Sequence, residues 1–197
     1  MDTAELLSEL EARPWFTFDT ARQLGLSKGS IYRLRDTGSI EVLARGLYQW
    51  AGAGTADPTL LAAAALRPES TLCLSSALAR HGLTDDIPRR YDIALPRGMR
   101  RPTIDGPIQW HAFEAATFEI GRMEANLDSG ISIGIYSAER CIIDAFRLRG
   151  REGHETANEA LKRWIAAPGT QPAQLLSMAR QLPRTDRPLR TALEILL

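Results

Sequence analysis

Basic and aromatic side chains gather on one side of a short segment near the N-terminus. Lys28 and Tyr32 are four residues apart, as are Gly29 and Arg33, so all four share one face of a helix. Lysine and arginine donate hydrogen bonds to guanine N7 and O6, and tyrosine contacts a phosphate or a thymine methyl group. Gly29 removes a side chain where the helix backbone would approach a duplex. This set of residue types therefore predicts binding of double-stranded DNA.

Two further arginines flank that face. Arg35 lies at its edge and is expected to contact backbone phosphate. Arg45 stands at the tip of a predicted hairpin, where it would contact phosphate or the minor groove. Asp36 follows Arg33 by three residues, so we expect these two side chains to form an ion pair when no DNA is bound.

The surrounding pattern predicts a helix-turn-helix with a wing. Asp19 and Ser27 are expected to cap the second and third helices, and Gly25 and Gly38 to end them. Ile31 marks the buried side of the third helix. The predicted elements are a first helix closed by Pro14, helices over 20–24 and 28–37, and strands over 40–44 and 47–50. Contact of this module with a protein instead of DNA is an alternative.

A small, glycine-rich stretch closed by proline, residues 50–58, is typical of a linker. We therefore expect two domains, a winged helix-turn-helix over 1–54 and a mixed α/β domain over 55–197. The second domain is predicted to contain helices over 58–66 and 75–81, strands over 91–95, 108–113 and 131–136, and several helices at its C-terminal end. The predicted fold class is α+β.

The composition is that of a folded chain with no net charge. Its 197 residues include 24 basic and 24 acidic side chains, and 44% are hydrophobic. Binding of nucleic acid must therefore depend on local patches and not on the field of the whole molecule. No apolar run is long enough to span a bilayer, and the first residues lack the features of a secretory signal. Cys73 and Cys141 lack metal-ligand spacing and are expected to be buried, reduced thiols of a cytoplasmic protein.

A set of short motifs follows the predicted wing in a fixed order. They occupy residues 74–83, 91–95, 135–144, 158–164, 174–180 and 193–196. In this order they resemble the AbiEi family, the antitoxins of abortive-infection toxin–antitoxin systems. The resemblance implies a winged helix that represses its own operon by binding inverted repeats in the promoter. It also implies that the chain counteracts a toxin of the nucleotidyltransferase class, with or without a stable complex.

Charged residues of the predicted second domain suggest two further features. Five arginines within residues 89–101 could present a positive face to DNA backbone or to an acidic toxin surface: Arg89, Arg90, Arg97, Arg100 and Arg101. Asp144 lies one turn from Arg140 and close to Arg147, which predicts a structural ion pair.

No enzyme motif stands out in the sequence. A nucleotidyltransferase would need an acid–x–acid pair to hold magnesium, and Ala94 stands where the second acid after Asp92 would be. We therefore expect no catalytic residues, cofactor or metal. One alternative is an antitoxin that transfers a phosphoryl group to its toxin, with a site drawn from Ser75, His81, Asp85, Asp86, Asp92 and Asp144. The other alternative is a winged-helix regulator that acts without a toxin.

Overall fold

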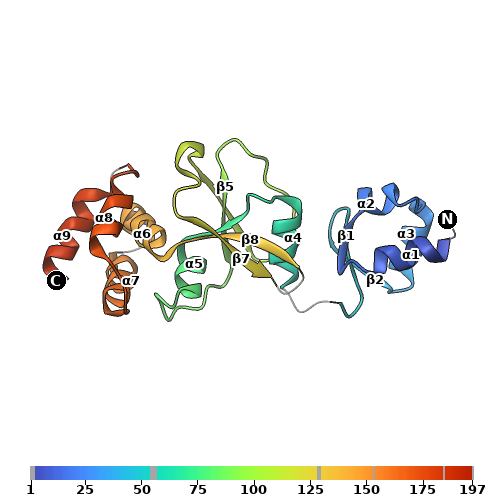
Figure 1. Ribbon diagram of the computed structural model, residues 1–197, viewed down its shortest axis with the longest axis horizontal. Helices are drawn as coiled ribbons and strands as arrows, with labels where there is room; N and C mark the ends of the chain where they lie inside the picture. Colours follow the sequence, from blue (N-terminus) through green and yellow to red (C-terminus); the bar gives the residue numbers. More distant parts are fainter. Residues whose placement is uncertain (1–2, 54–56, 128–129, 153, 184, 197) are drawn as a thin grey trace. The chain divides into compact units, whose positions relative to one another are not determined.

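The computed structural model describes residues 3–53, 57–127, 130–152, 154–183 and 185–196 (Figure 1). The mixture of helices and strands confirms the predicted α+β class. The chain divides into two compact units, the first made of Met1–Pro68, Pro102–Gly106 and Asn126–Ile133, and the second of Glu69–Arg101, Pro107–Ala125 and Gly134–Leu197. The domain boundary predicted after residue 54 falls outside the described residues. No helix in the described part of the chain is long and apolar enough to cross a membrane.

The first unit begins with three helices and a small antiparallel sheet. The elements are α1 (Thr3–Glu11), β1 (Trp15–Thr17), α2 (Phe18–Gln23), α3 (Lys28–Asp36), β2 (Ile40–Ala44), β3 (Leu47–Trp50) and α4 (Pro58–Leu66). The strand order is β1-β3-β2, so β3 lies in the centre. The three predicted helices and both strands of the wing are confirmed. The sequence did not predict β1, because three residues are too few to show an alternating pattern.

The helix ends follow the predicted capping chemistry with one correction. Thr17, and not Asp19, caps α2, because the last residue of β1 is extended and its hydroxyl accepts the Thr20 N–H at 3.0 Å. Asp19 lies in the first turn of that helix. Ser27 caps α3 as predicted, accepting the Ser30 N–H at 3.0 Å. Gly25 has a φ of +96°, which an L side chain rarely adopts, so the turn between the two helices requires glycine.

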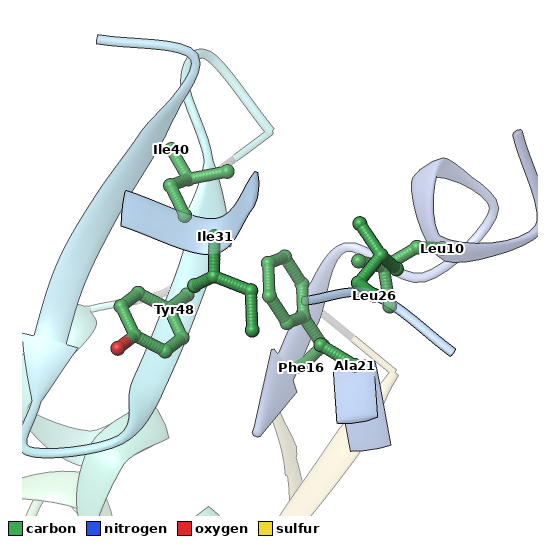
Figure 2. Close-up of a cluster of buried hydrophobic side chains, with 7 residues drawn as sticks. All are labelled: Leu10, Phe16, Ala21, Leu26, Ile31, Ile40 and Tyr48. Atoms are coloured by element: carbon green, nitrogen blue, oxygen red, sulfur yellow. The ribbon is translucent and has the colours of Figure 1, made fainter. Parts of the chain in front are cut away.

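Phe16 lies in the middle of the apolar core of this unit (Figure 2). Its ring is 5.6 Å from that of Tyr48 and 5.6 Å from that of Trp50. Ile31 of α3 and Ala21 of α2 are fully buried in the same cluster. These side chains come from α2, α3, β1 and the wing strand β3, so one core holds α3 and the wing together.

The second unit contains most of a five-stranded mixed sheet with the order β6-β5-β4-β8-β7. Its strands are β4 (Thr71–Leu72), β5 (Tyr91–Pro96), β6 (Ile108–Phe113), β7 (Arg122–Leu127) and β8 (Ile131–Tyr136). The strands predicted over 91–95, 108–113 and 131–136 are confirmed, while β4 and β7 were not predicted. The β4 strand is parallel to β8 and antiparallel to β5, and β5 is parallel to β6.

Helices complete this unit. They are α5 (Leu74–Arg80), the short 3-10 turn η1 (Ala115–Thr117), α6 (Ala138–Glu152), α7 (His154–Ala166), α8 (Pro172–Ala179) and α9 (Asp186–Leu196). The last four gather at the C-terminal end, as the sequence predicted, and α6 packs on α7, α8 and α9 (Figure 1).

The predicted ion pair between Arg140 and Asp144 is present and buried. Arg140 Nε donates to Asp144 Oδ2 at 2.9 Å, and neither side chain is more than 1% exposed. Nη1 of Arg140 donates to the carbonyl of Thr117 at 2.8 Å, and the guanidinium lies 4.4 Å from the ring centroid of Tyr136. The other oxygen of Asp144 lies 2.9 Å from Nη2 of Arg147. One carboxylate is therefore paired with two arginines of α6.

Loss of this carboxylate should destabilise the chain strongly. Asp144→Ala leaves a buried guanidinium without its counter-charge, so we expect the free energy of unfolding to fall by about 3–5 kcal/mol. Glu159→Ala is the matched control, because Glu159 accepts from Arg163 at the same four-residue spacing but in an exposed pair. That change should cost less than about 1 kcal/mol. Equal midpoints for the two variants in urea unfolding would contradict a structural role for the buried pair.

Candidate nucleic-acid interface

The exposed face of α3 carries the residues that the sequence singled out. Because Ile31 is fully buried, the opposite side of the helix faces outward. Lys28, Tyr32 and Arg33 are exposed there, with 38% of the large aromatic Tyr32 accessible. A Cβ added at Gly29 would meet only the Ser27 hydroxyl, at 3.7 Å. The start of α3 therefore has room for a Cβ at this position.

Two cations stack on the tyrosine of this face. Nζ of Lys28 lies 5.3 Å from the ring centroid of Tyr32, and the Arg35 guanidinium lies 4.8 Å from it. Contacts of this kind contribute about 0.5–1 kcal/mol at exposed sites. Arg35, expected at the edge of the face, is thus drawn onto the same surface as Tyr32. The ring therefore favours one position for each of these two long side chains.

The expected ion pair between Asp36 and Arg33 is wrong. Asp36 Oδ1 instead accepts from Nε and Nη2 of Arg35, at 3.0 and 2.8 Å. The physical reason is the stack on Tyr32, which holds the Arg35 guanidinium within reach of the next residue. This hydrogen bond raises the pKa of Arg35 above its ordinary value. The side chain of Arg33 forms no ion pair with any residue that the structure describes.

The wing places Arg45 beside the helix pair. Arg45 is exposed at the turn between β2 and β3, and Gly46 completes that turn with a φ of +77°. The carbonyl of Gly46 accepts the N–H of Phe18, the first residue of α2, at 2.7 Å. The turn that carries Arg45 is therefore tied to the helix-turn-helix by a backbone hydrogen bond.

The five arginines around β5 are all exposed, and the structure divides them between two neighbouring pockets. Arg89 and Arg90 line one pocket, and Arg97 and Arg101 line the other. Arg100 is exposed as well, but it lines neither pocket. The two pockets share Gln109 and His111 of β6.

The residues of the phosphoryl-transfer alternative are dispersed, with one exception. The hydroxyl of Ser75 donates to one oxygen of Asp92, and Nε2 of His111 lies 2.8 Å from the other. His111 was not part of the predicted set, because it is 19 residues from Asp92 and no local motif joins them. Three of the remaining four members have other partners: His81 with the Tyr136 carbonyl, Asp85 with Arg163, and Asp144 with Arg140. The fourth, Asp86, is exposed.

The local surroundings of the two cysteines determine their chemistry. Cys73 and Cys141 are both buried and free, as expected from their spacing. Burial raises the pKa of the Cys141 thiol well above its ordinary value, so the thiol is neutral. Within the described ranges, no three residues among His, Cys, Asp and Glu are grouped closely enough to hold a metal ion.

Comparison with known families identifies the first part of the chain. Residues 5–50 match a family described as transcriptional regulator, AbiEi antitoxin. The matched segment covers the three helices and the wing, which are the elements that carry the candidate interface. No curated protein matches the chain. Residues 5–50 are therefore similar to the AbiEi antitoxin family of transcriptional regulators.

Proposed function

We propose that this antitoxin represses its own operon by binding inverted repeats in the promoter through α3 and the wing. The observation that carries the proposal is the outward face of α3, where Lys28, Tyr32 and Arg33 stand on a helix anchored by Ile31. A helix of this kind enters the major groove, and the wing beside it reaches the phosphate backbone.

Each side chain of the interface has a separate task in the proposed complex. Arg33 is free of ion pairs among the described residues and donates to guanine N7 and O6. Lys28 does the same or contacts a phosphate, while Tyr32 packs on a thymine methyl group. Arg35 and Arg45 contact phosphates and so fix the register of the helix in the groove. Gly29 lets the helix backbone lie close to the duplex.

Arg35 must change its partner in this complex. In the free protein its guanidinium is hydrogen-bonded to Asp36, at 2.8 Å, on an exposed surface. Surface ion pairs of this type contribute less than about 1 kcal/mol, so a phosphate can displace the carboxylate at low cost. The same pair holds the arginine near Tyr32 until DNA is bound.

We further propose that residues 55–197 neutralise a nucleotidyltransferase-type toxin. The match of residues 5–50 to an antitoxin family supports the general role, and the toxin class is what the resemblance of the later motifs to the AbiEi family implies. This function needs no contact made by α3. Repression and neutralisation should therefore be separable by substitution.

Replacing Arg33 tests the DNA-binding proposal. Arg33→Ala should weaken binding to the promoter by about 1–3 kcal/mol, roughly 5- to 150-fold, because a bidentate contact with guanine is lost. Gel-shift titration at fixed salt measures the change. Arg180→Ala is the control, since Arg180 is exposed on the second unit and outside the interface. Equal affinities for the Arg33→Ala variant and wild type would contradict the assignment of α3 to the major groove.

Replacing Gly29 separates stability from binding. Gly29→Ala has room for its Cβ and should raise the free energy of unfolding by up to about 1 kcal/mol, because alanine favours a helix more than glycine does. The same methyl group would stand between the helix and the duplex, so promoter affinity should fall. Thermal unfolding and gel-shift titration on the same sample measure both effects. A variant that is more stable and binds equally well would show that this backbone does not approach DNA.

A growth assay tests neutralisation. Wild type and Arg33→Ala should both restore growth when co-expressed with a cognate toxin of the nucleotidyltransferase class, because the substitution affects DNA binding alone. Expression from a heterologous promoter removes any effect of autorepression. Failure of wild type to restore growth would reject the toxin class, and failure of Arg33→Ala alone would place neutralisation on the α3 face.

A further inference from the structure

The β6 strand lies at one end of the order β6-β5-β4-β8-β7 and pairs only with β5 among the described residues. Two hydrogen bonds, one at each end of the pair, show which residues of β6 bond to β5. The N–H of Tyr91 donates to the carbonyl of Pro107 at 2.6 Å, and the N–H of Arg97 donates to the carbonyl of Phe113 at 2.7 Å. In a parallel pair, alternate residues of a strand bond to the same neighbour. The odd-numbered residues of β6 therefore face β5.

The even-numbered residues of β6 consequently direct their backbone groups away from the sheet. The N–H and C=O groups of Ile108, Trp110 and Ala112 meet no partner strand within the part of the chain that the structure describes. Such an edge is a template for another strand unless a protein blocks it. Ala112 is exposed, so its small side chain leaves this edge open.

A groove follows this edge. A pocket of about 460 Å³ contacts every residue from 109 to 114, with Arg97, Arg101 and Arg147 on its other walls. Successive side chains of a strand point to opposite faces of the sheet. A pocket that touches six consecutive residues must therefore run along the edge of the strand and not over one face.

The groove is positively charged. A second pocket of about 300 Å³ is lined by Arg89 and Arg90 and shares Gln109 and His111 with the first. The two pockets together are lined by five arginines and two carboxylates. Both carboxylates already have donors: Asp92 has Ser75 and His111, and Glu114 has Arg97 at 2.6 Å. Arg97 and Arg147 are paired with Glu114 and Asp144, so the surplus of positive charge that an occupant meets comes from Arg89, Arg90 and Arg101.

We propose that the edge of β6 receives an extended, acidic segment of a partner protein as an added strand. The backbone of the segment would bond to the outward groups of Trp110 and Ala112, and carboxylates on alternate residues would pair with the arginines. A second copy of this chain is a poor occupant, because its arginines would face these ones. Nucleic acid is also poor, because phosphates supply no donors for the outward carbonyls. The proposal is independent of DNA binding by α3.

Ala112→Pro is the decisive variant. Proline is tolerated on a sheet edge where the N–H points outward, so the sheet should remain intact. The missing donor and the ring would prevent addition of a strand. The probe is a fluorescein-labelled ten-residue peptide of alternating glutamate and threonine, and fluorescence anisotropy measures its binding to the full chain. We expect the affinity to fall at least about tenfold, a change of about 1.4 kcal/mol.

Charge variants and a second readout complete the design. Arg101→Glu should weaken the peptide about tenfold or more, while Ala112→Val and Arg180→Glu should bind as wild type does. A matched peptide of lysine and threonine should not bind. Amide hydrogen exchange should show slower exchange at Trp110 and Ala112 when the acidic peptide is bound, because strand addition alone protects outward N–H groups. Circular dichroism confirms that each variant is folded.

Three results would overturn the proposal. The first is no binding of the acidic peptide at about 1 mM, the weak end of specific recognition. The second is unchanged affinity of a folded Ala112→Pro variant, which would show that the backbone edge is not used. The third is tighter binding of a single-stranded oligonucleotide that depends on Arg101 but not on Ala112, which would make the groove a site for nucleic acid.

Discussion

The burial of Ile31 against the core around Phe16 decides what α3 can do. Because that side chain is fully buried, the helix can present only one face, and the glycine turn and Ser27 cap fix where it begins. The same core includes Tyr48 of the wing. Helix and wing therefore share one apolar core, and the turn that carries Arg45 belongs to the same unit as α3.

Local signals were enough to predict much of this arrangement. Ser27, Gly38 and the tight turn at Arg45 and Gly46 act over a few residues, so the helices, the wing and the outward position of Arg33 follow from the sequence. Features that depend on distant partners do not follow from the sequence. The β1 strand is held by β3, and His111 meets Asp92 only because β6 lies beside β5. Prediction of the Arg35–Asp36 pair requires the position of the Tyr32 ring, which the pattern of residue types does not give.

A chain with no net charge can still bind anionic partners if its carboxylates are already engaged. At the α3 face, Asp36 accepts from Arg35, and in the groove Asp92 and Glu114 accept from neighbouring donors. Each carboxylate also orders a cation or an imidazole beside it. The acidic residues of these surfaces therefore position the groups that are proposed to bind, and they would oppose an anionic partner less than their number indicates.

Asp144 links the stability of the second unit to its groove. Its two oxygens face different arginines: Arg140, which is fully buried, and Arg147, which lines the groove and lies 5.5 Å from the ring centroid of Phe113. Phe113 is the last residue of β6. Removal of this carboxylate would thus loosen a wall of the groove as well as the core. A change in peptide binding by an Asp144 variant has to be interpreted together with its stability, whereas Ala112 touches the groove from an exposed edge and isolates the backbone contact.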